Sequence, residues 1–330
     1  MDRPRSDSVS VVISTCNRGA RILPTLQSVF AGVMLPLEII VVDQSDDAIA
    51  RETWCAVEQA ADTFAWRMSY ENESILLDQP GDLCYIRSRK HGLSHGRNSG
   101  AHAARGDVLI FADDDIIVDA HWVEMAHREF ESDPQVVGMY GKVLPDASSM
   151  EPIRGTDADL DARDVFTEPP APWYLGSGDN MAFRRDVLNQ CGMFDPLLGA
   201  GARLQACEGL DIGYRLLSFH LGKIIYTADW LVHQNHPKDF GEQIRAEQAH
   251  GIGAGGMLEK FARCGDPSAM KYLRLWMWHK AIRFRDEISN WRRRERMQLA
   301  LVQFWYPLVG AMWARHCAID RAYWTFRDKS

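Results

Sequence analysis

The sequence predicts an α/β fold: a mixed, mostly parallel sheet flanked by helices and followed by a helical C-terminal extension. Strand-like and helix-like segments alternate through the first half of the 330 residues, as in sheets whose parallel strands are joined by crossover helices. An apolar run at 108–111 suits a strand covered on both faces and leads into three consecutive aspartates. Beyond about residue 241 the pattern is helical, with many Trp, Arg and Met residues.

The first predicted elements lie before residue 72. Alternating Ser and Val/Ile residues predict a strand over 8–14, and the polar turn 15–19 separates it from a helix over 21–30. A second apolar run predicts a strand over 37–42 that ends at Asp43, and residues 66–70 give a weaker third strand. Strands that end in polar residues at one sheet edge are typical of α/β ligand sites.

The later predicted elements flank an irregular segment. They are helices over 94–104 and 119–131, strands over 136–143 and 223–232, and a helix that opens near Glu208. The segment 145–172 has no periodicity and ends in Pro169-Pro170-Ala171-Pro172. A long irregular stretch of this kind is typical of a lid or binding loop.

Composition indicates an ordinary folded protein, with 46% hydrophobic and 25% charged residues. The net charge of −8 argues against a nucleic-acid partner held by phosphate electrostatics. Seven scattered cysteines indicate free thiols rather than a disulfide framework. No signal peptide is visible, so we expect a cytoplasmic protein, with a peripheral position at the inner face of the membrane as an alternative.

The three aspartates, Asp113, Asp114 and Asp115, are the most informative feature of the chain. Their carboxylates would repel one another unless a cation or hydrogen-bond donors compensated them. A solvated acidic turn that caps the next helix is the simpler explanation. Other motifs of the chain favour the cation.

The ordered series of motifs resembles family 2 glycosyltransferases, which are inverting enzymes with the Rossmann-like GT-A fold. The series consists of Thr15 and Asn17, Asp43, the stretch 92–98 (GLSHGRN) leading to 104–107 (ARGD), and the three aspartates. The resemblance covers residues 8 to about 236. It implies a glycosyltransferase domain over 1–240, with a nucleotide-sugar half over about 1–118 and an acceptor half over about 119–240. Residues 241–330 would form the helical extension.

The resemblance implies that Asp113 and Asp115 form the family's D-x-D motif. Asp115 would bind a divalent metal directly, either Mn²⁺ or Mg²⁺, since both prefer oxygen ligands. Asp113 would contact the ribose hydroxyls and contribute to the metal site. Asp114 would line the nucleotide-sugar site or point into the fold. His233, rather than His236, would be a further metal ligand, although a histidine after a strand is more often structural.

The remaining donor and acceptor residues follow from the same resemblance. Thr15, Asn17, Asp43 and Arg97 would line the nucleotide pocket, where Arg97 could pair with a diphosphate oxygen. Gly178, Asp179 and Asn180 lie in a small-residue stretch that would contact the sugar and the acceptor. A glycine-rich turn entering a strand explains that stretch equally well.

The chain departs from the family pattern at the position where many relatives carry the catalytic base. Gly209 stands where many relatives carry an acid that is often the base. The role then passes to Glu208 or Asp211, which lie on one helix face, and we favour Glu208. Acids at a helix N-terminus also complement its dipole, without any catalytic role.

The predicted function is an inverting, metal-dependent glycosyltransferase that uses a nucleotide-diphosphate sugar, with UDP-sugars favoured. The acceptor hydroxyl would belong to a glycan, a lipid-linked sugar or a small molecule. The alternatives are a sugar nucleotidyltransferase and a non-catalytic nucleotide- or carbohydrate-binding protein. The C-terminal segment would pack on the enzyme, form a homodimer face or lie on an anionic membrane. It contains Trp276, Trp278, Trp291, Trp305 and Trp313, with Arg292-Arg293-Arg294 between them.

Overall fold

A computed structural model describes residues 8–72, 83–144, 163–234, 239–288 and 294–328. The chain divides into two compact units. The first, here called the sheet unit, comprises residues 1–194 and 212–237. The second, here called the helical unit, comprises residues 195–211 and 238–330.

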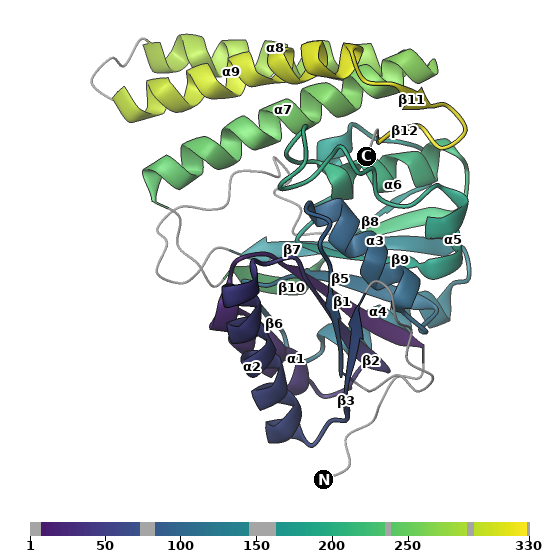
Figure 1. The fold of residues 1–330 in the computed structure, drawn as a ribbon. Coiled ribbons are helices and arrows are strands. Elements are labelled where there is room, and N and C mark those ends of the chain that lie inside the picture. Colours follow the sequence, from purple (N-terminus) through teal and green to yellow (C-terminus); the bar gives the residue numbers. More distant parts are fainter. Residues whose placement is uncertain (1–7, 73–82, 145–162, 235–238, 289–293, 329–330) are drawn as a thin grey trace. The chain divides into compact units, whose positions relative to one another are not determined.

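A mixed β-sheet organises the sheet unit (Figure 1). Its strands are β1 (Val9–Thr15), β2 (Glu38–Asp43), β3 (Met68–Asn72), β4 (Leu83–Arg87), β5 (Val108–Asp113), β6 (Ile116–Val118), β7 (Val136–Leu144), β8 (Arg163–Phe166), β9 (Asn180–Arg184) and β10 (Lys223–Gln234). Their order is β3-β4-β2-β1-β5-β9-β7-β10-β6, and β8 pairs with β10. The first five strands are mutually parallel, while β9 is antiparallel to both β5 and β7. The predicted mixed, mostly parallel sheet is therefore confirmed.

Helices cover both faces of this sheet. They are η1 (Gly19–Ile22), α1 (Leu23–Phe30), α2 (Asp47–Phe64), α3 (Leu93–Ala103), α4 (Trp122–Ser132), η2 (Pro172–Tyr174), α5 (Arg185–Gln190) and the part of α6 (Glu208–Ser218) that belongs to this unit. Alternate residues of a strand point to opposite faces. Val11 of β1 accordingly joins a core with Leu26 of α1 and Val57 of α2, while Val12 lies on the α3 side.

The segment 145–172 is irregular in the sequence prediction. Residues 145–162 lie outside the described residues. Residues 163–166 form β8, which pairs antiparallel with β10, so the prediction is wrong for that part. Four residues give too short a pattern to indicate a strand, and the pairing with β10 is what stabilises it.

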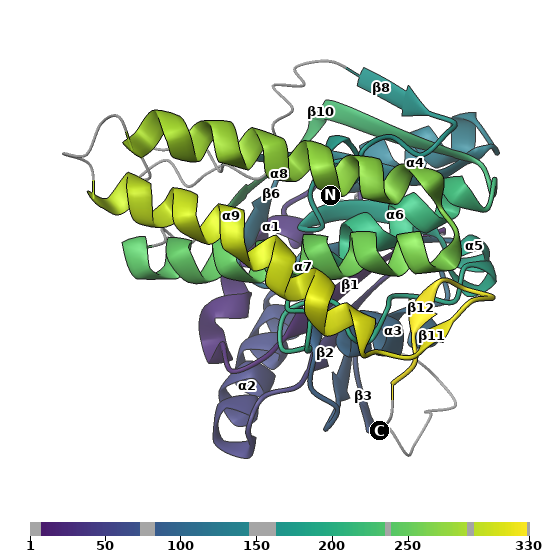
Figure 2. The ribbon, with the colours of Figure 1, turned by 90° about the horizontal axis from the view of Figure 1, so that it is seen from above.

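Three helices dominate the helical unit: α7 (Phe240–Cys264), α8 (Pro267–Ile288) and α9 (Arg294–Arg315). They pack side by side (Figure 2) and precede the short hairpin of β11 (Ile319–Asp320) and β12 (Thr325–Phe326). A capping box starts α7: the Glu242 amide donates to the Asp239 carboxylate at 2.7 Å, and the Asp239 amide donates to the Glu242 carboxylate at 3.0 Å. None of the helices in the described ranges is both long and apolar enough to cross a membrane.

Candidate active site

One edge of the sheet gathers the carboxyl ends of β1, β2 and β5. Thr15 ends β1 opposite Asp43, the last residue of β2. Asp113 ends β5 opposite Ser14 of β1. In open α/β sheets, ligands bind outside the carboxyl ends of the strands. The structure thus brings the predicted nucleotide-site residues of three strands to one edge.

The antiparallel part of the sheet adds two more predicted residues to this edge. Asn180 begins β9 opposite Ala112, the residue before Asp113. Exposed His233 lies near the end of β10, opposite Ile117 of β6, and β6 begins immediately after Asp115. His236 lies outside the described residues.

The middle aspartate of the triplet points into the fold. Asp114 is 7% exposed, and its carboxylate accepts a hydrogen bond of 2.5 Å from the Thr15 hydroxyl. Its backbone carbonyl accepts another from the Thr25 hydroxyl at 3.0 Å. Burial raises the pKa of Asp114 to about 7, against the opposing effects of the Thr15 hydrogen bond and the Arg18 guanidinium. A direct contact between Asp114 and a nucleotide stays a prediction, which this position does not favour.

The outer aspartates are partly open to solvent and each pairs with an arginine. Their side chains are 27% exposed in Asp113 and 23% in Asp115. Arg97, which is nearly fully buried, donates to Asp113 at 2.8 Å and to the Gly178 carbonyl at 3.0 Å. Arg18 lies 3.0 Å from the Asp115 carboxylate.

Arg18 was not predicted to have a role from the sequence. The signal was its place in the polar turn 15–19 directly after the first strand. Only the fold shows that this turn meets the segment after β5. Arg18 and nearly buried Arg97 supply two guanidinium groups beside two partly exposed carboxylates, and of the two arginines Arg18 is the one that an anionic ligand can reach.

Asp43 is fully buried, and both of its carboxylate oxygens have protein donors. The Ser45 amide donates to one at 2.8 Å, and the Tyr85 hydroxyl donates to the other at 2.5 Å. Burial, together with this hydrogen bond to Asp43, raises the pKa of Tyr85. A contact between the Asp43 carboxylate and the nucleotide, as its predicted place in the pocket implies, therefore requires that the Tyr85 hydroxyl move away.

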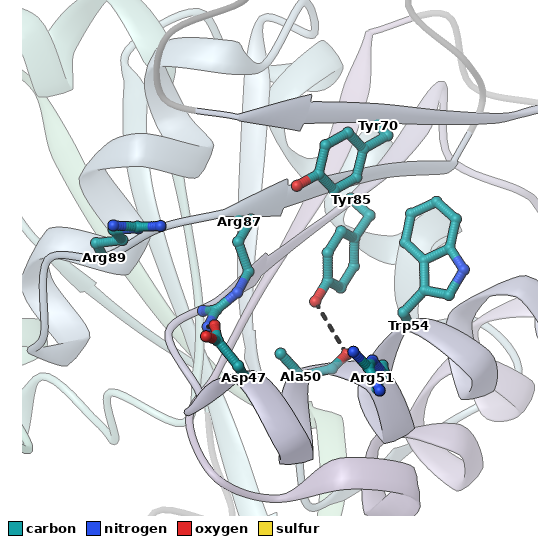
Figure 3. A pocket seen from close by; sticks show the side chains of 8 residues that line it. All are labelled: Asp47, Ala50, Arg51, Trp54, Tyr70, Tyr85, Arg87 and Arg89. Carbon is teal, nitrogen blue, oxygen red and sulfur yellow. Dashed lines mark hydrogen bonds and ion pairs between the residues drawn. The ribbon is translucent and has the colours of Figure 1, made fainter.

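Tyr85 also lines a pocket of about 280 Å³ beside α2, β3 and β4 (Figure 3). Its hydroxyl donates to the Ala50 carbonyl at 3.3 Å, the contact drawn as a dashed line in Figure 3. The pocket lining combines aromatic rings with charged side chains: Asp47, Ala50, Arg51, Trp54, Tyr70, Tyr85, Arg87 and Arg89. Through Tyr85, the lining of this pocket is hydrogen-bonded to Asp43.

Asn17 shapes the turn after β1. It adopts a left-handed backbone conformation (φ 56°), which Asn tolerates better than most residues. Its amide donates to the Ser45 hydroxyl at 2.7 Å, and its side-chain oxygen accepts from the Asp46 amide at 2.9 Å. These bonds join the turns that follow β1 and β2.

Asn180 has its polar atoms bound within the protein. It is fully buried, accepts from the Trp122 indole at 3.0 Å and donates to the Trp230 carbonyl at 2.8 Å. The preceding residues, Gly178 and Asp179, are half-buried. In this structure Asn180 joins α4 to β10, and its predicted contact with a sugar stays a prediction.

The two candidate bases belong to the helical unit and differ in their surroundings. Glu208 is the first residue of α6 and is 6% exposed. Asp211 is fully buried and lies 2.5 Å from the Lys260 ammonium, which also lies 2.6 Å from buried Asp195. Burial raises the pKa of Asp195, and the Lys260 charge opposes that rise. Because Asp211 is committed to an ion pair, Glu208 is the better candidate.

The carboxylate oxygens at the sheet edge fit a divalent cation that takes its remaining ligands from substrate and water. No three His, Cys, Asp or Glu side chains within the described ranges are close enough to hold a metal by themselves. Mg²⁺ is usually bound through one or two carboxylates plus substrate phosphates and water. Asp113 and Asp115 offer two such carboxylates, both partly exposed.

Comparison with known proteins identifies the family. The sequence matches the family described as Glycosyl transferase family 2 over residues 10–192, more than half of the chain. The chain belongs to this family. The sequence resemblance to family 2 is thereby confirmed, and with it the assignment to a class of transferase enzymes.

Two curated glycosyltransferases are similar to part of the chain. A glucosyl-dolichyl phosphate glucuronosyltransferase of Haloferax volcanii is 28% identical over 58% of this chain and 57% of its own length. An uncharacterized glycosyltransferase of Nostoc sp. is 22% identical over 57% of this chain and 54% of its own. The chain thus spans about half the length of the curated relatives it matches.

A solved structure of a glycosyltransferase shares the fold. The mannosyltransferase of Pyrobaculum calidifontis, in complex with GDP-Man and Mn²⁺, is 17% identical, with a TM-score of 0.56 over 96% of this chain and 89% of its own. At this identity the likeness concerns the fold alone, and it confirms the predicted GT-A type.

Proposed function

We propose that this protein is an inverting glycosyltransferase that moves a sugar from a nucleotide-diphosphate sugar to an acceptor hydroxyl. The observation that carries the proposal is the pair of partly exposed carboxylates, Asp113 and Asp115, each beside an arginine at the carboxyl edge of the sheet. Membership of glycosyltransferase family 2 supplies the class of reaction.

Donor binding is proposed at this edge. Arg18 could exchange its aspartate partner for diphosphate oxygens, a charge-assisted contact, whereas Arg97 would first have to become exposed. Thr15, Asn17 and Asp43 would frame the nucleoside, with Tyr85 controlling access to Asp43. UDP-sugars are the favoured donors, and the GDP-Man of the similar mannosyltransferase makes GDP-sugars the next to test.

Asp115 and Asp113, with His233 as a third candidate, would hold Mn²⁺ or Mg²⁺ together with the donor diphosphate. When bound, such a cation would act as a Lewis acid that stabilises the departing diphosphate. The Mn²⁺ in the similar mannosyltransferase supports this part of the proposal. The Arg18 and Arg97 pairs would keep the carboxylates compensated before the donor arrives.

Glu208 is the proposed general base. An inverting reaction needs a base within hydrogen-bond reach of the acceptor hydroxyl, on the face opposite the leaving group. The Glu208 carboxylate would take the proton of that hydroxyl as its oxygen attacks the anomeric carbon. Gly178 and Asp179 are the proposed contacts to sugar or acceptor, with Asn180 positioning the start of β9.

A lipid-linked acceptor is one candidate, because the name of the Haloferax relative describes transfer to glucosyl-dolichyl phosphate. In the helical unit, one face of α9 exposes four apolar side chains at helical spacing: Leu301, Trp305, Leu308 and Met312. Trp291, Arg292 and Arg293 lie outside the described residues. We propose that this face contacts a membrane surface, at the cytoplasmic side, or a second copy of the chain.

The proposal is tested by binding followed by turnover. UDP, GDP and dTDP are titrated with and without Mn²⁺, and the matching nucleotide-sugars are then incubated with acceptors. The expected result is metal-dependent nucleotide binding and release of free nucleoside diphosphate with transfer of the sugar. In a parallel incubation of nucleoside triphosphates with sugar 1-phosphates, release of pyrophosphate with formation of a nucleotide-sugar would instead indicate a nucleotidyltransferase. Metal-dependent binding without transfer would indicate a binding protein, which the glycine at position 209 would explain.

A further inference from the structure

The loop before α6 is held in a strained conformation. Gln205 (φ 62°) and Cys207 (φ 70°) both adopt left-handed backbone conformations, although neither is glycine. Such residues persist only where the surrounding structure holds them, and they cluster at functional sites. Glu208, the proposed base, follows directly. The conformation of the loop therefore fixes the position of the Glu208 backbone, from which its side chain extends.

One face of α7 supports this loop within the helical unit. A Cβ at Gly253 would lie 2.5 Å from the Ala206 carbonyl oxygen, and a Cβ at Gly256 would lie 2.9 Å from the Leu204 side chain. Only glycine allows the helix to come this close. The Cys207 thiol donates to the His250 carbonyl at 3.7 Å, one turn earlier on the same face.

Lys260 continues this face of α7 and joins the two ends of the segment 195–211. Its ammonium lies 2.6 Å from the Asp195 carboxylate and 2.5 Å from the Asp211 carboxylate, and all three side chains are 0% exposed. The Phe326 amide also donates to Asp195 at 2.8 Å. Buried charges are retained only when they are paired, so this cluster fixes its members in one geometry.

We propose that Lys260 is a positioning residue for sugar transfer: by holding Asp195 and Asp211, it fixes the loop that presents Glu208. This inference rests on the proposed function, since it assumes that Glu208 is the base. It assigns a catalytic contribution to the C-terminal helices, because Lys260 lies outside the residues 10–192 that match the family. The base itself touches substrate, whereas Lys260 acts only through the loop.

The test compares two variants that disturb the cluster with one that does not. Lys260→Met removes the charge and leaves two buried carboxylates, while Asp195→Asn keeps the Lys260–Asp211 pair and is the milder change. The control is Glu259→Gln, on the neighbouring position of α7, which breaks the 3.1 Å pair between Glu259 and Arg315 of α9. We expect the control to keep wild-type turnover.

We expect both cluster variants to lower kcat by about tenfold to a hundredfold, because a small misplacement of a reacting group has effects of that size. Donor KM and the Kd for Mn²⁺-nucleotide should stay within about twofold of wild type. A purely structural role would lower Tm without a selective fall in kcat. Wild-type kcat in folded Asp195→Asn would overturn the inference, and this variant decides the matter if Lys260→Met does not fold.

Amide hydrogen exchange separates this inference from the proposed function. Exchange at residues 204–211 should become faster in Asp195→Asn and stay unchanged in Glu259→Gln, whether or not a donor sugar has been found. Unchanged exchange in Asp195→Asn would overturn the positioning role. A wild-type protein that transfers no sugar would overturn the proposed function while faster loop exchange still supported the role of Lys260 in holding the loop.

Discussion

Thr15 and Asp114 join the ends of β1 and β5 through a hydrogen bond of 2.5 Å between the Thr15 hydroxyl and the Asp114 carboxylate. This bond turns the middle aspartate of the triplet inward, while Asp113 and Asp115 stay partly exposed. The triplet thus combines one structural carboxylate with two that a ligand can reach.

The inward position of Asp114 predicts a pH-dependent stability. Its pKa of about 7 in the folded state exceeds the ordinary value of 3.8, which applies to the unfolded state. Between about pH 4 and pH 7 the folded state therefore binds more protons than the unfolded state. The free energy of unfolding therefore falls as pH rises through that window, by at most about 4 kcal/mol. In denaturant unfolding in metal-free buffer, the free energy of unfolding should differ less between pH 5 and pH 8 for Asp114→Asn than for wild type. An equal difference in both proteins would contradict the assignment.

Tyr85→Phe tests the buried bond to Asp43. The variant leaves one buried carboxylate oxygen without its donor, so we expect a loss of about 1–3 kcal/mol in the free energy of unfolding. Tyr70→Phe is the matched control, since Tyr70 lines the same pocket but is 43% exposed. Equal stabilities of the two variants in denaturant unfolding would show that the Tyr85 hydroxyl contributes nothing.

Glu208→Gln tests the proposed base. Loss of a general base lowers turnover by about 10²- to 10⁴-fold, and we expect this fall in kcat with unchanged binding of Mn²⁺-nucleotide. Asp211→Asn should lower kcat less, because Asp211 acts through the Lys260 pair. Steady-state kinetics and calorimetry measure both quantities. A fully active Glu208→Gln enzyme would remove the residue from the mechanism.

Trp305→Gln tests the exposed face of α9. Trp305 is 60% exposed on a helix whose same face also exposes Leu301 and Met312. If this face lies on a membrane, the variant should sediment several-fold less with anionic vesicles. If it joins two copies, light scattering should show a smaller mass for the variant. Identical behaviour of variant and wild type in both measurements would leave the face without either role.

Most of the sheet was predictable because its strands carry strong local patterns. The apolar runs at 8–14, 37–42 and 108–111 each became a strand within two residues of the predicted bounds. α2 and β4 were not predicted from the sequence. β4 has only five residues, too short a pattern to indicate a strand, and its pairing with β2 and β3 stabilises it. α2 does carry a helical pattern, since its buried residues Ala50, Thr53, Val57 and Ala60 recur at helical spacing.

The sheet edge at which the candidate site lies was predictable from the residues that follow the strands, whereas the partners that reach this edge from elsewhere in the chain were not. Thr15, Asp43 and Asp113 were placed correctly at one edge because parallel strands end together. Arg18 meets Asp115 across 97 positions, and Lys260 meets Asp195 across 65. No local pattern encodes such pairs, since they arise from tertiary packing.

The most direct test of the account is calorimetric titration of UDP and GDP in the presence of Mn²⁺ into wild type, Asp115→Asn and Asp107→Asn. Asp107 directly precedes β5, at the opposite end of the strand from Asp113, with a 78% exposed side chain, so Asp107→Asn is a control for charge. We predict metal-dependent binding by wild type and the control and at least a tenfold loss in Asp115→Asn, with all three proteins equally folded. Undiminished Mn²⁺-dependent binding by Asp115→Asn would contradict the claim that the sheet edge holds the donor through its carboxylates.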